Sequence, residues 1–145
     1  MIMGIIMAID YGLKRLGIAI SNPEETMSVP LTIIDVRPDD SHYKSIIKLI
    51  SDYNVKEIVI GLPYNMDGTL GFSGNNVVEW STSLKETLGI PVALWDERLS
   101  TFEAHNLLAS INIRHKKRKR IVDSLAACII LQNYIDSKNH EKEQN

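Results

Sequence analysis

Apolar runs separated by short polar breaks extend along most of this chain. The short runs predict β-strands, and they lie at residues 1–9, 16–21, 28–36, 57–62 and 91–95. Other segments repeat apolar residues every three or four positions and predict helices, at residues 42–53, 75–88, 101–111 and 119–135. Three strands therefore come first, and helices and strands then alternate. This order predicts an α/β fold with a mixed sheet and helices on its faces.

Local signals refine the arrangement of these elements. The first run is apolar on both faces, so we expect it at the centre of the sheet. Its connection to the second run is a short turn, which indicates an antiparallel hairpin. Asp40 or Ser41 is expected to cap the first helix, and Gly89 is expected to end the second. Residues 61–74 are rich in Gly, Pro, Asn and Asp and are expected to form a loop.

Length and composition point to a single soluble domain. Residues 1–136 of the 145 are expected to form this domain, followed by a polar, frayed tail at residues 137–145. No apolar run approaches the roughly 20 residues of a membrane span. The N-terminal run has no basic leader segment and stops at Asp10, which argues against a signal peptide. The single cysteine, Cys128, lies in an apolar helix and is expected to be a core residue. We therefore expect a cytoplasmic protein without membrane contact.

Charge is distributed unevenly along the chain. The net charge is −2, yet residues 114–120 carry six of the 16 Lys and Arg residues. The rest of the chain then holds 10 basic residues against 18 acidic ones. A dense basic segment on an acidic body predicts a focused contact with a polyanion such as nucleic acid. The plainer alternative is a solvated charged segment without a partner.

Three carboxylates are placed where regular elements begin or end. Asp10 follows the first strand, Glu97 follows the fifth, and Asp123 opens an apolar helical segment after the basic run. If the three converge, their oxygen atoms form a donor set that suits Mg²⁺. Metal-assisted cleavage of a phosphodiester is then the chemistry to expect. Two of them also have simpler explanations. Asp10 could stabilise a turn, and Asp123 could interact with the dipole at the first turn of its helix.

Four sequence blocks resemble the signature blocks of a known family. They read DYGLKRLGIAIS at residues 10–21, GLPYNMDG at 61–68, DERLST at 96–101 and IVDSLAACIIL at 121–131. In this order they resemble the YqgF/RuvX family, which comprises Holliday-junction-resolvase-like nucleases associated with maturation of the pre-16S rRNA 5′ end. The likeness extends over about residues 7–134. It implies an RNase H-like fold with a five-stranded mixed sheet in the order 3-2-1-4-5, helices on both faces, and convergence of Asp10, Glu97 and Asp123.

The resemblance also implies roles for individual residues. Asp10, Glu97 and Asp123 would be the catalytic residues and would hold Mg²⁺ or Mn²⁺, with Asp10 shared between two ions about 3.5–4 Å apart. Successive side chains of a strand point to opposite faces, so Asp96 and Glu97 cannot share one face. The resemblance favours Glu97 as the ligand. The expected substrate-binding residues are Lys14, Arg15, Asn65, Arg98, Lys116, Lys117, Arg118, Lys119 and Arg120.

Several of these substrate-binding assignments have plainer alternatives. Lys14 and Arg15 could be solvated residues of a turn. Asn65 could hold its own loop together through local hydrogen bonds. Arg98 could brace a carboxylate instead of binding a phosphate, since its planar guanidinium suits either partner.

Three hypotheses for function follow. The leading one is a metal-dependent endonuclease acting on structured nucleic acid, with precursor ribosomal RNA favoured over a branched DNA junction. The second is a nucleic-acid-binding assembly factor that does not cut, since sites of this fold can lose activity. The third is a nucleotide-binding relative of the actin and sugar-kinase group, and the chain has length for only one of the two domains that such proteins close around a nucleotide. A homodimer would suit symmetric cleavage of a junction, but no sequence feature decides the oligomeric state.

Overall fold

Five strands and three helices make up the part of the chain that the structure, a computed structural model, describes. It describes residues 4–12, 14–62, 67, 70–96 and 115–144, and of residues 72–73, 115–123 and 142–144 the backbone only. The strands β1 to β5 are Ile5–Tyr11, Arg15–Ser21, Ser28–Asp35, Val55–Leu62 and Val92–Asp96. The helices are α1 (Ser41–Tyr53), α2 (Phe72–Leu88) and α4 (His115–Gln144). The helix predicted at residues 101–111 lies outside the described residues.

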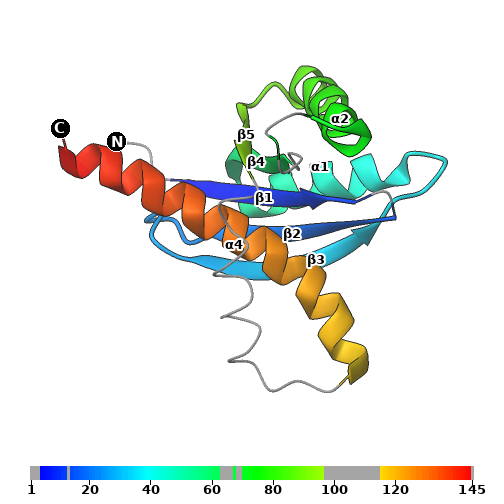
Figure 1. Ribbon diagram of the computed structural model, residues 1–145, viewed down its shortest axis with the longest axis horizontal. Helices are drawn as coiled ribbons and strands as arrows, with labels where there is room; N and C mark the ends of the chain where they lie inside the picture. The colour runs from blue at the N-terminus through cyan, green and yellow to red at the C-terminus, as the bar shows by residue number, and fades with distance from the viewer. Residues whose placement is uncertain (1–3, 13, 63–66, 68–69, 97–114, 145) are drawn as a thin grey trace.

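The strands form one mixed sheet with β1 at its centre (Figure 1). The order of the strands is β3-β2-β1-β4-β5. β1, β2 and β3 pair antiparallel in sequence, whereas β4 pairs parallel to β1 and β5 pairs parallel to β4. The predicted hairpin, the central first strand and the order 3-2-1-4-5 are therefore confirmed. The carboxyl ends of the parallel strands β1, β4 and β5 meet at one edge of the sheet.

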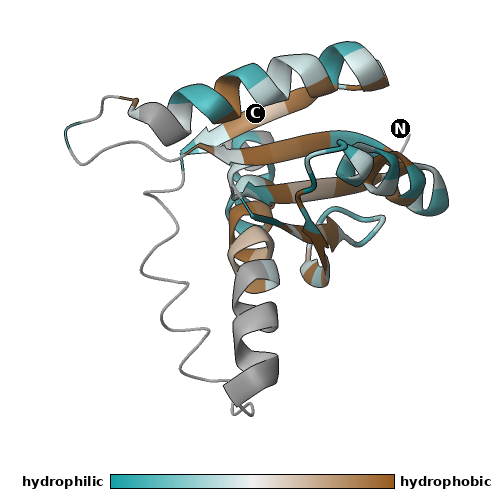
Figure 2. Ribbon diagram, turned by 90° about the vertical axis from the view of Figure 1, so that its right-hand side faces the viewer, coloured by the Kyte–Doolittle hydropathy of each residue, from teal (hydrophilic) through white to brown (hydrophobic). Residues whose placement is uncertain are grey.

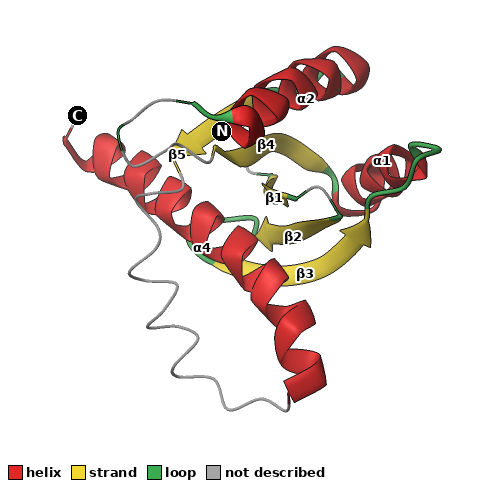
Figure 3. Cartoon of the chain, turned by 45° about the vertical axis from the view of Figure 1, so that its right-hand side comes forward, coloured by secondary structure: helices red, strands yellow, loops and turns green. Residues whose placement is uncertain are grey.

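Alternating side chains of β1 divide the core into two clusters. Met7 and Ile9 pack with residues of α1 and α2, while Ile6 and Ala8 pack with residues of α4. All four are fully buried. Figure 2 shows the apolar strands enclosed between the helices, and Figure 3 shows α4 crossing one face of the sheet while α1 and α2 cover the other. Burial on both faces is the reason that consecutive residues of this strand are apolar.

The helix ends follow the predicted signals in part. Asp40 precedes α1, but its side chain makes no capping hydrogen bond to the helix. The Asp39 carboxylate instead accepts a hydrogen bond from the Ser41 N–H at 3.0 Å, and the bonds from Ser41 lower the pKa of Asp39. Gly89 ends α2 as predicted. Its φ is 69°, in the left-handed region, and its N–H donates to the Lys85 carbonyl at 3.0 Å.

Two details of α1 and α2 differ from the prediction. Both Ile46 and Ile47 are apolar residues of the helix predicted at 42–53, yet Ile47 is 43% exposed while Ile46 is fully buried. Adjacent helical residues are 100° apart, so only one of the two can face the sheet. α2 begins at Phe72, inside the segment predicted to be a loop. Gly74 is buried there, and tertiary packing outweighs its low helix propensity.

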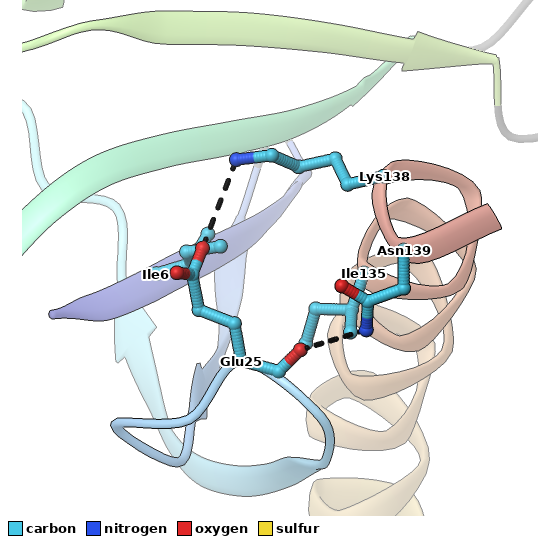
Figure 4. Close-up of a pocket in the computed structure, with 5 residues that line it drawn as sticks. All are labelled: Ile6, Glu25, Ile135, Lys138 and Asn139. Carbon is cyan, nitrogen blue, oxygen red and sulfur yellow. Dashed lines mark hydrogen bonds and ion pairs between the residues drawn. The ribbon is translucent and has the colours of Figure 1, made fainter. Parts of the chain in front are cut away.

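The last helix, α4, is longer than predicted at both ends. It starts four residues before the expected position and includes residues 137–144 of the polar tail that was predicted to fray. Figure 4 shows what holds its C-terminal part: Lys138 forms an ion pair with the Glu25 carboxylate at 3.7 Å, and the Asn139 amide donates to the Glu25 carbonyl at 3.1 Å. These partners come from a distant part of the sequence, so local polarity gave no sign of them. No helix in the described part of the chain is long and apolar enough to cross a membrane.

Cys128 lies in the core, as predicted. It is 8% exposed and lies on the side of α4 that faces β3. The Ser28 hydroxyl donates to the Cys128 carbonyl at 2.7 Å and lies 3.0 Å from the Cys128 Sγ. Burial raises the pKa of the Cys128 thiol. Because the thiolate is the reactive form, the raised pKa disfavours a nucleophilic role and agrees with the predicted packing role.

Candidate active site

Asp10 lies at the edge of the sheet where the three parallel strands end. It is the second-to-last residue of β1, and Asp96 is the last residue of β5. Gly61 of β4 lies beside Asp10, because the register pairs Ile9 with Ile60. The carboxyl ends of parallel strands are the usual ligand side of an α/β sheet. Asp10 thus occupies a position at which α/β proteins commonly bind their ligands.

The Asp10 side chain is on the face of the sheet that α4 covers. Ile6 and Ala8 belong to the cluster that packs with α4, and alternation along the strand gives Asp10 the same face. Asp10 pairs with Gly17 of β2 on one side and lies beside Gly61 of β4 on the other. Neither neighbour has a side chain. The half-buried Asp10 carboxylate is therefore the only long side chain in its row across these three strands.

Asp96 lies on the opposite face of the sheet from Asp10. Trp95 packs with the cluster under α4, whereas Val92 packs with the cluster under α1 and α2. Alternation along β5 places Asp96 on the face of Val92. Asp96 and Asp10 are consequently separated by the sheet and do not form one metal site. Glu97, the residue predicted to be the ligand, lies outside the described residues.

Asp123 lies inside α4 and not on its first turn, where it was predicted. Because α4 starts at His115, Asp123 falls in the third turn of the helix. The helix dipole acts mainly within the first turn, so it does not account for a carboxylate at this position. One turn later, Ala127 is fully buried against the sheet, and Ser124 is buried as well. Small residues therefore let this part of α4 approach the sheet.

Residues 115–120 of the basic run form the first turns of α4. The sequence predicted the run as a segment that precedes a helix starting at residue 119, but residues 115–120 are helical. Consecutive helical residues are 100° apart, so the five basic residues at 116–120 are distributed around the whole helix. The structure describes only their backbone. Asn65 and Arg98, two further predicted substrate contacts, lie outside the described residues.

Lys14 and Arg15 follow Asp10 in the hairpin between β1 and β2. Lys14 is exposed and Arg15, the first residue of β2, is half-buried. The Val36 N–H donates to the Lys14 carbonyl at 2.9 Å, which ties the turn to the end of β3. The hairpin therefore holds the exposed Lys14 side chain at the same edge of the sheet as Asp10.

Gly12 is required in this hairpin by close packing. A Cβ atom at Gly12 would lie 2.6 Å from the Arg15 carbonyl oxygen, closer than such atoms can approach. We expect Gly12→Ala to lower the free energy of unfolding by about 1–3 kcal/mol, because the turn must open to relieve the clash. Urea unfolding followed by circular dichroism measures this change.

Gly89 supplies the comparison for this prediction. It has a left-handed φ of 69° and open space where a Cβ would lie. Gly89→Ala should cost about 1–2 kcal/mol through backbone strain alone. If Gly12→Ala unfolded at the same urea concentration as the unaltered protein, the hairpin would accommodate the extra atom and the packing argument would be wrong.

Carboxylates are the predicted donors of the metal site, and they are the ligands that Mg²⁺ and Mn²⁺ prefer. Asp10 is the member of the predicted set whose side chain the structure describes. No group of three His, Cys, Asp or Glu residues gathers among the described side chains, a set that leaves out Glu97 and Asp123.

The sequence offered no reason to assign a role to Trp95 and Tyr134, whose contact joins β5 to α4. They are far apart in the chain, and no local signal connects them.

Comparisons of the sequence with a family model and with individual proteins agree on one family. The model of the RuvX family, described as Holliday junction resolvase, matches residues 4–137. A protein of Thermoanaerobacter pseudethanolicus named "Putative pre-16S rRNA nuclease" is 43% identical over 137 residues, which cover 94% of this chain and 99% of that protein. A protein of the same name from Bacillus cytotoxicus is 42% identical over 135 residues, which cover 92% of this chain and 98% of that protein.

Solved structures share the fold at low sequence identity. RuvC of T. thermophilus in complex with Holliday junction substrate has a TM-score of 0.60 and 11% identity, and the match covers 94% of this chain and 96% of RuvC. The Fowlpox virus resolvase in complex with Holliday junction DNA has a TM-score of 0.52 and 13% identity, with 92% and 97% covered. The likeness confirms the predicted RNase H-like fold with its five-stranded mixed sheet.

Proposed function

Because the chain belongs to the RuvX family of Holliday junction resolvases, we propose that it is a metal-dependent endonuclease that hydrolyses phosphodiester bonds in structured nucleic acid. Precursor 16S rRNA is the favoured substrate, since relatives 42–43% identical over nearly their whole length are named as nucleases of that RNA. Cleavage at its 5′ end is what the resemblance of the four sequence blocks implies. The observation that carries the proposal is the position of Asp10. It lies at the carboxyl edge of the parallel strands and on the face covered by α4.

Asp10, Glu97 and Asp123 are the proposed ligands of Mg²⁺ or Mn²⁺. Such ions polarise the scissile phosphate, activate water and stabilise the leaving oxygen. Two observations support these acids over simpler explanations. Asp96 is on the opposite face from Asp10, which favours Glu97 as the acid that β5 leads to. Asp123 lies in the third turn of α4, where the helix dipole gives no reason for a carboxylate.

Basic residues around this edge would bind the nucleic-acid backbone. Lys14 is exposed on the hairpin beside Asp10, and the basic residues at 116–120 open the helix that carries Asp123. Their charges would neutralise phosphates of any sequence and place a backbone across the carboxylates. Arg15, Asn65 and Arg98 are proposed as further contacts at the same edge.

A four-way DNA junction is the second candidate substrate. The family description names this activity, and the fold is shared with RuvC, which was solved with a Holliday junction. At 11% identity this likeness supports the fold alone, whereas the relatives above 40% identity are named for the RNA. The RNA is therefore the preferred substrate, and cleavage of a junction would indicate a homodimer because two symmetric cuts need two sites.

The test compares three end-labelled substrates: a precursor 16S rRNA leader, a four-way DNA junction and an unbranched DNA duplex. Each is incubated with the protein and Mn²⁺, Mg²⁺ or EDTA. We expect cutting of the leader at a defined position with either ion and none with EDTA. Preferential cutting of the junction would replace the RNA by DNA as substrate. Tight, salt-dependent binding without any cutting would identify an assembly factor and refute the nuclease.

A further inference from the structure

Tyr134 of α4 lies where three elements of the fold meet. Its ring contacts the Trp95 ring of β5 edge to face, with centroids 5.7 Å apart and planes inclined by 81°. Its hydroxyl donates to the Glu57 carboxylate of β4 at 2.9 Å. Lys138, one turn later in α4, donates to the same carboxylate at 3.1 Å and places its ammonium 5.3 Å from the Tyr134 ring centre. One side chain thus joins α4 to both β4 and β5.

The contacts of Tyr134 and Trp95 differ in kind. Burial, and then the hydrogen bond to Glu57, raise the pKa of Tyr134, so its hydroxyl stays protonated and donates at neutral pH. The indole Nε1 of Trp95 is buried and meets no hydrogen-bond acceptor in the described part of the chain. Trp95 therefore acts through its ring, while Tyr134 acts through both its ring and its hydroxyl.

Both aromatic residues are aligned with the proposed metal ligands. Trp95 pairs with Gly61, which lies beside Asp10, so Trp95 stands in the row of Asp10 and on the same face. Glu97 comes two residues after Trp95 in the chain. Asp123 comes eleven residues before Tyr134 in α4, and three helical turns take about 10.8 residues. Their backbone positions are therefore on the same side of the helix.

We propose that Tyr134, seated against Trp95, is a positioning residue of the metal site, fixing α4, which carries Asp123, relative to the sheet, which carries Asp10. The inference rests on the proposed function, which assigns the metal to Asp10, Glu97 and Asp123. Asp123 is about 16 Å from Tyr134 along the helix axis. A tilt of about 5° at Tyr134 moves the Asp123 backbone by roughly 1.4 Å. Mg²⁺ demands a nearly ideal octahedron with short bonds, so it tolerates such a displacement poorly.

The test measures binding of Mn²⁺ alone to the full chain, without nucleic acid, by titration calorimetry and by the electron paramagnetic resonance signal of free Mn²⁺. Tyr134→Leu removes the ring contact and the hydrogen bond, and we expect the Kd for Mn²⁺ to rise about tenfold or more. Tyr134→Phe keeps the ring against Trp95 and should restore most of the affinity. The same titrations with Mg²⁺ and Ca²⁺ supply a readout of geometry. Because Ca²⁺ accepts flexible coordination, Tyr134→Leu should weaken Mg²⁺ more than Ca²⁺.

Tyr43 provides the matched control on the other face of the sheet. Its ring lies 5.9 Å from that of Trp80, and this pair joins α1 to α2, neither of which carries a proposed ligand. Tyr43→Leu should lower stability in a similar way and leave the Kd for Mn²⁺ unchanged. Should Tyr134→Leu fail to fold, Trp95→Phe is titrated in its place. This change replaces the indole by a smaller ring and reduces its contact with Tyr134, so it is expected to weaken Mn²⁺ binding as well.

The outcomes separate this inference from the function on which it rests. If the unaltered protein binds Mn²⁺ and Asp10→Asn does not, but Tyr134→Leu binds as tightly as the unaltered protein, Tyr134 has no positioning role. Equal weakening by Tyr134→Leu and Tyr43→Leu would also overturn the inference, because it would reflect stability alone. If the unaltered protein binds no Mn²⁺, the metal site itself is wrong and the inference is overturned with it.

Discussion

Asp10→Asn is expected to slow metal-dependent cleavage by roughly 10³-fold while the protein stays folded. Asparagine has nearly the shape of aspartate but lacks the charge that holds a divalent ion. Metal stabilisation of the transition state is worth several kcal/mol, and each factor of ten in rate corresponds to about 1.4 kcal/mol. The stability cost should be small, because Asp10 is half-buried at a strand end and the exchange conserves volume. Single-turnover cleavage at saturating Mn²⁺, with circular dichroism of both proteins, measures the two effects.

Asp96, the last residue of β5, and Glu97, which follows it in the sequence, provide a matched pair for this experiment. Glu97→Gln should cause a loss similar to that of Asp10→Asn, because Glu97 is a proposed ligand. Asp96→Asn removes the same charge one residue earlier but on the opposite face from Asp10, so most activity should be retained. A full loss with Asp96→Asn and none with Glu97→Gln would show that the face assignment is wrong. Equal cleavage by Asp10→Asn and the unaltered protein would mean that Asp10 holds no catalytic metal.

Neutralising part of the basic run is expected to weaken nucleic-acid binding by roughly 10²-fold at low salt. Lys116, Lys117 and Lys119 are changed together to Gln, which keeps the helix propensity of this part of α4. Each lost phosphate contact reduces the slope of log affinity against log salt by about 0.9 for duplex and 0.7 for single-stranded nucleic acid. The slope should therefore decrease by about two to three. Binding of a labelled RNA leader at several salt concentrations, with EDTA present to prevent cutting, measures both quantities.

Three lysines on the helices of the other face of the molecule give the control. Lys44 and Lys48 of α1 and Lys85 of α2 are changed to Gln, so the net charge changes by the same amount. This variant should bind the leader nearly as tightly as the unaltered protein. If both triple variants lost affinity equally, binding would depend on total charge and not on the basic run. No loss in either would mean that the run is a solvated helix end without a nucleic-acid contact.

Much of the fold could be predicted because its signals are local. The first strand is apolar at consecutive positions because both of its faces are buried, and that pattern is visible without any partner. The turn after Asp10 is too short for anything except a hairpin, and Gly89 ends α2 through its left-handed backbone. The polar tail of α4 was predicted wrongly because the sequence shows local signals only, and the contacts that hold this tail are not local. Its helix is held by Glu25 and Glu57, two residues that come from other parts of the chain.

For the candidate site as well, the sequence indicated the residues, and only the packing decided on which face of the sheet they lie. The residue types and their places at element ends indicated Asp10, Glu97 and Asp123, and the four motif blocks by themselves indicated the family. The face on which Asp10 lies could not be read from its neighbours, because β1 is buried on both sides. Only the packing of Ile6 and Ala8 under α4 assigns that face. The exclusion of Asp96 also needed the packing of Trp95 and Val92.

The sequence by itself determined the order of the elements, the central position of the first strand, the family and the acids on which the proposed chemistry depends. These follow from hydrophobic periodicity, turn residues and motif spacing, which act over a few neighbouring positions. Only the tertiary structure decided which face of the sheet carries Asp10, where α4 begins and ends, and that Tyr134 meets Trp95. Contacts of that kind join residues far apart in the chain, and the periodicity around each residue indicates that it is buried but not which distant residue it meets.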